Sequence, residues 1–405
     1  MTANIELTME EMLADPDRAL GRARDAGAVV GTDLGVLVVR YEAVRGVLQD
    51  PRLRPSFSKF LERMGITSGP FYEWMSMSPL DMEGEPHRVW RKLVLRTFTP
   101  RSVERLRPFL RREADRLIDG FVADGRVEFI DAFARKLPSL GLCELIGVPA
   151  EDRSRFGVWA DTIGLGFNLV MAPARIGEID AALVQLLEYS RALVEKRRAA
   201  PLDDLVSRLA LGAEEDGVKP EQIHGTVAGL VFAGHETTKN QLGWLVTALS
   251  EVPAEWDRVA TEPERARDVV EEVLRFRSTV TSVGRLALED VELFGTKLPK
   301  GSTVIASLWS ANRDAAAFVR PDEFDTDAHR DGAQLAFGQG AHHCLGAALA
   351  RAELQESLVA LASRLECPKL EPGATFLPPV GINGPTALPI RFESRRTSRA
   401  PTRPG

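Results

Sequence analysis

Residues 337–346 of this chain read Phe-Gly-Gln-Gly-Ala-His-His-Cys-Leu-Gly, and this stretch decides how the rest of the sequence is interpreted. Cys344 stands just before an Ala- and Leu-rich segment of helical spacing, roughly residues 346–365. A helix N-terminus favours an anion, and the N–H groups after Cys344 can donate to its sulfur, so a thiolate there is stabilised. The glycines permit backbone shapes closed to other residues and let the loop lie close against a flat group.

Two other interpretations of Cys344 stay open at this point. A lone cysteine is most often a buried structural residue. A zinc ion held by His342, His343 and Cys344 is the second alternative, although adjacent residues do not easily supply three ligands to one tetrahedron and no partner pair lies nearby.

Composition narrows the class of protein. The 405 residues are 44% hydrophobic and 27% charged, as in an ordinary globular protein with a large core, and the net charge of −7 argues against general nucleic-acid binding. No apolar run of about 18 residues predicts a membrane span, and residues 1–16 lack the pattern of a secretory signal. Three cysteines without a leader indicate a reducing compartment, so we expect a cytoplasmic protein.

The sequence predicts a mainly α fold with a small β-sheet portion. Residues 29–40 read as a strand pair, and short strands recur between 283 and 305. The longest helical run, 223–249, is apolar almost throughout, which predicts a buried central helix. Further helices are expected at 86–98, 101–121, 131–146, 151–165, 176–199 and 264–276. We expect a flexible leader at 1–14, a single domain at 15–393 and a disordered tail at 394–405.

Polar residues interrupt the central helix at 233–238, which read Ala-Gly-His-Glu-Thr-Thr. A buried carboxylate and two buried hydroxyls are costly unless they are hydrogen-bonded or functional. Gly234 leaves room for a flat ligand or O2, and a Thr hydroxyl can bond to a carbonyl one turn earlier and open the helix locally. The alternative is a buried kink whose polar groups are satisfied. No role is assigned to His235.

These motifs together resemble the cytochrome P450 superfamily of haem-thiolate monooxygenases, of the soluble bacterial type. The loop matches the family pattern Phe-Gly-x-Gly-x-His-x-Cys-x-Gly at every position, and the resemblance spans nearly the whole chain. It implies a cytochrome P450 fold whose long central helix lies over a haem b. It further implies that Cys344 binds the iron and that the loop contacts the haem through Phe337, Gly338, Leu345 and Gly346.

The same resemblance assigns roles outside the loop. Glu236 relays protons and Thr237 holds the iron-bound oxygen for protonation. Haem propionates want cationic partners, and the family places His342, His87, Arg91 and Arg285 there. Taken singly, each of these cations would be better explained as solvated surface charge.

A structural pair, Glu272 and Arg275, resembles the Glu-x-x-Arg pair that holds the region behind the cysteine loop, with the segment around Asn312–Asp314 and Phe324 as its partner. The family often has a second Arg where Val89 stands and a Pro after Asp314, and this chain has neither.

The family's substrate pocket maps onto mostly apolar positions, which suits a hydrophobic ligand. Some of them are expected to be core residues. The positions are Phe71 and Trp74 in a loop at 71–79, then Phe167, Leu230, Ala233, Val280, Thr281 and Ile382.

No flavin or iron–sulfur motif is visible, so electrons from NAD(P)H must arrive through separate proteins. We expect a ferredoxin and its reductase, steered to a cationic patch of Arg88, Lys92, Arg96 and Arg101. The predicted function is hydroxylation or epoxidation of a small apolar molecule in secondary metabolism, by a monomer that binds neither nucleic acid nor membrane. The alternatives are a peroxygenase driven by H2O2, whose relatives tend to carry Arg-Pro in place of Glu236-Thr237, and a non-catalytic haem protein.

Overall fold

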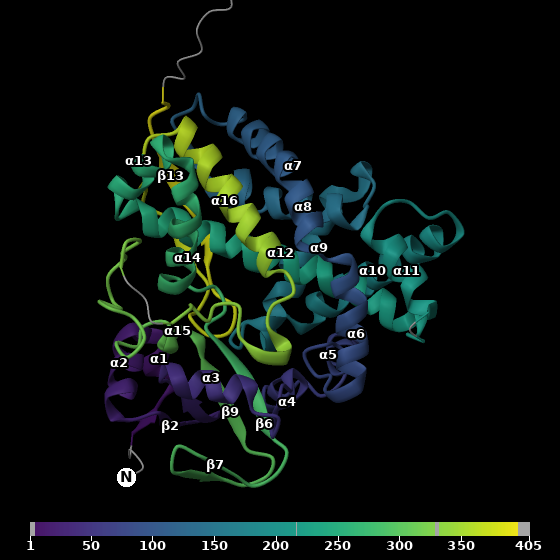
Figure 1. Cartoon of the computed structure of the whole chain (residues 1–405), viewed down its shortest axis with the longest axis vertical. Helices are drawn as coiled ribbons and strands as arrows, with labels where there is room; N and C mark the ends of the chain where they lie inside the picture. The colour runs from purple at the N-terminus through teal and green to yellow at the C-terminus, as the bar shows by residue number, and fades with distance from the viewer. Residues whose placement is uncertain (1–4, 216, 329–331, 396–405) are drawn as a thin grey trace, which may run out of the picture.

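Helices dominate the architecture (Figure 1). The computed structural model describes residues 5–215, 217–328 and 332–395. The helices within them are α1 (Met9–Ala14), α2 (Pro16–Ala26), α3 (Tyr41–Gln49), α4 (Phe57–Arg63), α5 (Pro70–Ser76), α6 (Gly84–Thr97), α7 (Pro100–Asp119), α8 (Lys136–Ile146), α9 (Arg153–Gly164), α10 (Ala172–Ala199), α11 (Leu205–Glu215), α12 (Pro220–Ser250), α13 (Pro253–Thr261), α14 (Ala266–Phe276), α15 (Leu308–Ala311) and α16 (Ala347–Arg364). The mainly α fold class is therefore confirmed.

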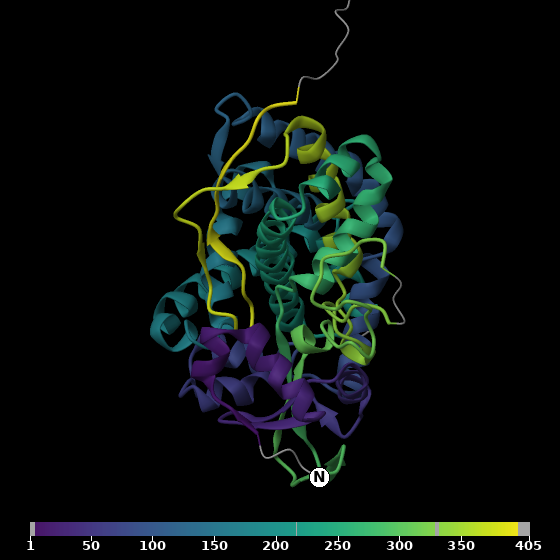
Figure 2. The same ribbon diagram turned by 90° about the vertical axis from the view of Figure 1, so that its left-hand side faces the viewer.

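The predicted central helix is α12, which has 31 residues and packs against α8, α9, α10 and α16. Figure 2 shows it in the middle of the molecule, enclosed by other helices on both sides. Such a helix is apolar around its whole circumference because every side meets protein. Leu230, Ala233, Gly234 and Thr237 are more exposed than their neighbours, and they mark the side that faces a cavity.

The strands form one larger sheet and three small ones. The six-stranded sheet has the order β1-β2-β3-β9-β6-β4, in which β2 (Val29–Thr32) and β3 (Gly35–Val38) are the predicted hairpin. The other members are β1 (Glu6–Leu7), β9 (Thr303–Ser307), β6 (Ser282–Ala287) and β4 (Leu53–Arg54). The remaining sheets are β10 (Lys369–Leu370) with β13 (Pro389–Arg391) and β5 (Arg126–Glu128), β11 (Thr375–Phe376) with β12 (Pro385–Ala387), and β7 (Val291–Leu293) with β8 (Thr296–Leu298).

The N-terminal segment is not a flexible leader over the residues that the structure describes. Leu7 pairs with Thr32 in parallel and is 1% exposed, and Thr8 caps α1 with a reciprocal bond to Glu11. The prediction of a flexible segment is wrong for residues 5–14, because burial of an apolar residue at the sheet edge stabilises a segment whose composition is acidic. Residues 1–4 lie outside the described residues. Of the predicted tail, Ser394 and Arg395 bond to residues 364 and 365, and 396–405 lie outside the description.

The buried apolar residues form three clusters among the described residues. The largest cluster of buried residues surrounds α12, and two smaller clusters lie on the two faces of the six-stranded sheet. One large cavity is enclosed between them, lined by α12, the start of α16, β6 and residues 336–346. The fold thus places the cysteine loop and the central helix in the wall of the same cavity.

Candidate active site

Cys344 lies in the cavity wall with its side chain exposed into the cavity. Its backbone N–H donates to the carbonyl of Phe337 (2.9 Å), which closes the loop, and Gly338 and Gly340 have φ of +67° and +77°. A Cβ at Gly340 would come within 2.8 Å of the Leu48 carbonyl oxygen, so a larger residue is excluded there. The loop shape therefore depends on its glycines, as predicted.

The electrostatics of Cys344 differ from the prediction. Burial raises the pKa of the Cys344 thiol above its ordinary value, and the N–H groups of Gly346 and Ala347 together with the charges of Arg91 and Arg351 offset this only in part. A helix N-terminus alone therefore does not make a thiolate here. A metal ion supplies the missing charge, because a coordinating thiol is deprotonated outright. The donor set thus fits a sulfur-ligated metal better than a free reactive cysteine.

A buried cation that has no ion-pair partner within the described part of the chain lies near the loop. Arg285, on β6, is 6% exposed and lines the cavity, and its guanidinium donates only to the carbonyl of Gly284 (2.9 Å) among the described residues. Burial lowers the pKa of Arg285 to about 10, with Glu83 opposing it weakly. A buried charge needs a partner. An anionic group in the cavity, such as a haem propionate, fits this requirement.

Two histidines stand with Arg285 in the lining. The rings of His87 and His342 stack at 4.1 Å, and Nε2 of His342 lies 2.9 Å from Glu83. Burial and the nearby charges of His342 and Arg91 lower the pKa of His87 to about 4. His87 is therefore neutral at pH 7, and it offers an N–H donor to a carboxylate instead of the positive charge that we expected.

Arg91 also contacts the cysteine loop itself. Its Nη2 donates to the carbonyl of His343 (2.7 Å), so the side chain braces the cysteine loop from α6. Arg91 lines the cavity as well, and the i, i+4 spacing does place it on the same face of α6 as His87.

On α12, the hydroxyl of Thr237 donates to the carbonyl of Ala233 (2.7 Å), the bond one turn back that the sequence predicted. Helix α12 nevertheless runs through 233–238 without a break, so the expected local opening is absent in this described segment. Gly234 lines the cavity, and a Cβ there would come within 3.1 Å of Leu142 of α8, so the missing side chain also lets these two helices pack closely. Glu236 is buried, bonds to Lys239 and Asn240, and does not line the cavity.

Sequence reasoning missed a fully buried carboxyl group in the cavity lining. Glu353, on α16, is fully buried, and burial raises its pKa well above the ordinary value while the nearby Thr238 hydroxyl offsets only part of the rise. A glutamate within an Ala- and Leu-rich helix is an available sequence signal, because such a residue is rarely buried without a partner.

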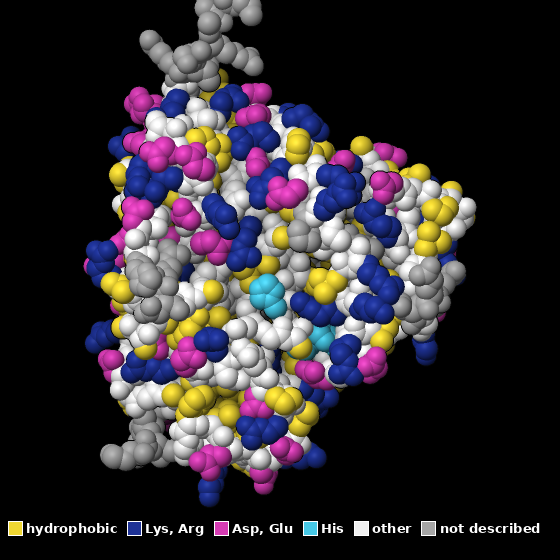
Figure 3. Space-filling model, viewed as in Figure 1, with side chains coloured by type: hydrophobic (Ala, Val, Ile, Leu, Met, Phe, Trp, Pro, Cys, Tyr) yellow, Lys and Arg dark blue, Asp and Glu magenta, His cyan; other side chains and the backbone are white. Residues whose placement is uncertain are grey.

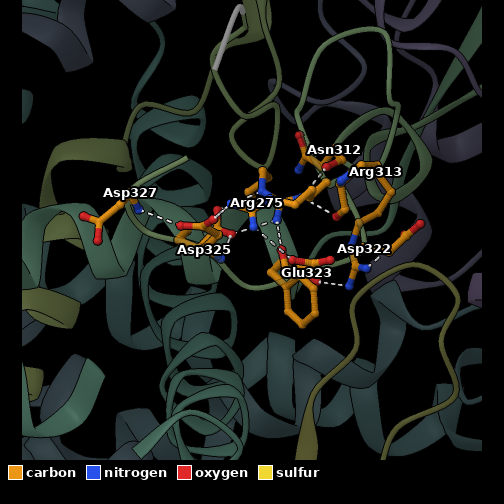
Figure 4. Close-up of polar contacts among 11 residues, drawn as sticks. Arg275, Asn312, Arg313, Asp322, Glu323, Asp325 and Asp327 are labelled. Carbon is orange, nitrogen blue, oxygen red and sulfur yellow. Dashed lines mark hydrogen bonds and ion pairs between the residues drawn. The ribbon is translucent and has the colours of Figure 1, made fainter. Parts of the chain in front are cut away.

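The predicted structural pair has the expected neighbours (Figure 4). The Arg275 guanidinium binds both carboxylate oxygens of Glu272 (2.7 and 2.8 Å). Its remaining N–H groups donate to three backbone carbonyls, so all five donors are used; the acceptors are Asn312, Pro321 and Glu323. Glu272 in turn accepts from the N–H of Asp325. The pair therefore fastens α14 to residues 312–325.

Most of the predicted substrate residues line the cavity: Trp74, Phe167, Leu230, Ala233, Val280, Thr281 and Ile382. Phe71 is the exception, because the segment 70–76 is helix α5 and turns this ring into the core, 0% exposed and against Gly166. The Thr281 hydroxyl donates to the Gly381 carbonyl and accepts from the Gly381 N–H, both at 3.1 Å, so it can offer a ligand only its second lone pair and no proton.

The cavity wall combines Cys344, the buried Arg285, which has no ion-pair partner among the described residues, and the Thr237 hydroxyl of α12. This combination fits a haem-thiolate protein. The cytochrome P450 family model matches residues 175–372. Luteothin monooxygenase of Streptomyces thioluteus is 35% identical and covers 92% of each chain. Cytochrome P450 monooxygenase PikC of Streptomyces venezuelae is 35% identical over 96% of this chain and 93% of its own.

Solved structures agree. P450BioI in complex with a hexadec-9Z-enoic acid-ligated acyl carrier protein has a TM-score of 0.86, 29% identity and coverage of 95% of this chain and 100% of its own. A mutant of P450 EryK in complex with erythromycin B has a TM-score of 0.82, 32% identity and coverage of 96% and 99%. The chain therefore belongs to the cytochrome P450 family. It is a cytochrome P450 monooxygenase, whose reaction uses O2 and a thiolate-bound haem.

Among the described residues, no helix combines the length and apolar character that a membrane span requires.

Proposed function

We propose that the Cys344 thiolate would hold the iron of a haem b, and that the enzyme hydroxylates or epoxidises a small, largely apolar molecule of bacterial secondary metabolism. The observation that carries this proposal is the shared cavity of about 1010 Å³, because Cys344 and Thr237, from elements far apart in sequence, both line it. Its lining is mostly apolar, which suits an apolar substrate. The names of relatives such as mycinamicin IV hydroxylase/epoxidase of Micromonospora griseorubida support the substrate class.

Different residues would bind the propionates and the iron of the haem. The haem, when bound, supplies the chemistry of oxygen activation, and the thiolate donates electron density to its iron. Arg285 would hold a propionate as a cation, and His87 and His342 would hold one as N–H donors. Phe337, Gly338, Leu345 and Gly346 would shape the thiolate side, where backbone N–H groups after Cys344 tune the sulfur.

The distal residues hold and move protons. The Thr237 hydroxyl donates to the Ala233 carbonyl, which leaves its lone pairs free to accept a hydrogen bond from the cavity. Glu236 is the nearest carboxylate in sequence, and we assign it the relay of protons toward Thr237. Apolar side chains that line the cavity around Thr237 exclude other water there and so limit wasteful proton transfer.

We further propose that a ferredoxin, reduced by its reductase, docks over α6. Figure 3 shows Lys and Arg side chains gathered over this part of the surface. Arg88, Lys92 and Arg96 lie there together with Arg91, and Arg101 follows at the start of α7. Arg88 is paired with Glu85, so its charge contributes less than the sequence suggested. The monomeric state and the cytoplasmic location stay predictions.

The test begins with the ligand. The reduced protein under carbon monoxide should show the red-shifted Soret band of a thiolate-ligated haem, and Cys344→Ser should lose it. Thr237→Ala should then divert electrons from NAD(P)H into H2O2 while the Soret band remains. An unchanged spectrum in Cys344→Ser would overturn the ligand assignment, and unchanged coupling in Thr237→Ala would overturn the distal role. For the docking face, Lys92→Glu with Arg96→Glu should slow reduction by ferredoxin, more so at low salt.

A further inference from the structure

The cavity extends beyond the space around Cys344 and Thr237, into a lobe between the N-terminal helices and the six-stranded sheet. Its wall there comes from α1, α2, β3 and α4, which lie far from both residues in sequence. In Figure 1, α1, α2 and α4 lie with the sheet at the lower end of the molecule. The apolar lining of the lobe includes Leu7, Met12, Leu20, Leu34, Leu37 and Phe60.

One of the three buried apolar clusters is hollow at this lobe. Leu7, Leu20, Leu37 and Phe60 belong to the same cluster and are between 1% and 8% exposed, yet all four line the cavity. Protein interiors are close-packed, and side chains around an empty space lose contacts that a packed core would give them. A cluster that keeps such a space open beside a substrate cavity is therefore explained by an apolar ligand.

The polar residues of the lobe leave it mostly apolar. The Thr8 hydroxyl accepts from the N–H of Glu11, and the Thr32 hydroxyl donates to the carbonyl of Gly35, so both are engaged with their own turns. Asp33 also lines the lobe, but it is exposed and so keeps its charge in water. The lobe thus favours a group that needs no hydrogen bonds.

A row of aromatic rings connects the lobe with α12. Phe232 of α12 stacks on Phe167 at 4.2 Å, and Phe167 stacks on Phe57 of α4 at 4.8 Å. Phe60 follows one turn later on α4, and a Cβ at Gly284 of β6 would collide with its ring, so the glycine lets this ring lie against the sheet. All four rings line the cavity, whose wall is therefore apolar from α12 to the lobe.

We propose that the lobe binds the far end of an extended, unbranched apolar substrate whose reacting part lies near Cys344 and Thr237; this rests on the proposed function and narrows its substrate class. Such a chain can follow the row of rings from α12 to the lobe. Each methylene that leaves water for the lobe strengthens binding up to about four-fold, which corresponds to about 0.8 kcal/mol. A compact molecule would fill the space near Thr237 and leave the lobe empty.

1-Alkylimidazoles measure how far the cavity accepts a chain, because their ring nitrogen binds haem iron and shifts the Soret band while the alkyl group extends away from it. The probes are 1-butyl-, 1-heptyl- and 1-decylimidazole, each titrated into the haem-loaded enzyme. Met12→Trp and Leu34→Trp fill the lobe from its half-buried rim, where a larger side chain does not have to enter the core. Leu13→Trp is the matched control, because Leu13 follows Met12 on α1, is 40% exposed and does not line the cavity.

We expect the affinity of the wild type to rise about two- to four-fold per methylene from the butyl to the decyl probe. Met12→Trp and Leu34→Trp should each bind the decyl probe at least about ten-fold more weakly than the wild type, with the affinity for the butyl probe unchanged, because only the long chain reaches the lobe. Leu13→Trp should match the wild type for all three probes.

Equal affinities of the wild type for the three probes would overturn the lobe as a substrate site. Wild-type affinity for the decyl probe in both rim variants would overturn it as well, because the chain would then run elsewhere. If the Soret band of the wild type does not respond even to the butyl probe, the haem site of the proposed function fails, and the lobe as a substrate site fails with it.

Discussion

Replacing Arg285 should have opposite effects on the haem-free and the haem-loaded protein. Lowering the pKa of this guanidinium from its ordinary value to about 10 corresponds to about 3 kcal/mol that the fold loses by holding the cation in a buried place. Arg285→Met keeps the length of the side chain and removes the charge. The haem-free variant should therefore unfold at higher urea concentration, with a free energy of unfolding higher by about 1–3 kcal/mol.

The haem-loaded variant should lose a charge-assisted hydrogen bond to a propionate, worth about 1.5–3 kcal/mol. Haem should then leave about 10 to 100 times more readily, as measured by transfer to apomyoglobin. The control is Arg313→Met. Burial also lowers the pKa of Arg313 to about 10, but Arg313 donates to the Phe276 carbonyl (2.8 Å) and lies over its ring at 3.8 Å, so both forms should be destabilised. An Arg285→Met protein that is less stable without haem and retains haem normally would refute the reasoning.

Three more predictions follow from the contacts. Since burial raises the pKa of Glu353, the folded chain keeps a proton that the unfolded chain releases, and the free energy of unfolding falls by about 1.4 kcal/mol per pH unit from the ordinary carboxyl pKa up to the raised value. In urea titrations across this pH range, the free energy of unfolding of Glu353→Gln should depend less on pH than that of the wild type. Identical pH slopes for the two proteins would contradict the assignment. Arg275→Lys should lower the free energy of unfolding by about 3–5 kcal/mol, because a lysine cannot serve five acceptors; a loss below about 1 kcal/mol would argue against it. Phe71→Ala should lower the free energy of unfolding by about 3–5 kcal/mol and leave the affinity for ligands unchanged. Trp74→Ala should instead lower the affinity for apolar ligands in spectral titrations. The reverse pattern would show that Phe71 faces the substrate.

Sequence patterns determined those features that depend on residue order alone. The glycines and the cysteine of 337–346 specify a loop with positive φ angles before a helix, and a helix that is apolar on all sides has to be buried, so both motifs and the position of α12 were predictable. The i, i+3 spacing of Glu272 and Arg275 likewise fixed their contact, because residues at this spacing meet on any helix.

Only the tertiary structure decided where side chains from separate elements point and which charges are left without partners. Neighbours that are distant in sequence decide whether Arg285 has a counter-ion and whether Arg91 turns toward the loop. They also decide whether Glu236 faces the cavity or the contact between α12 and α9. Burial then sets the pKa values of these groups. The same applies to Leu7, whose place in the sheet comes from a strand more than 20 residues away. Local periodicity carries no information about these contacts, since desolvation and pairing arise only when the elements pack.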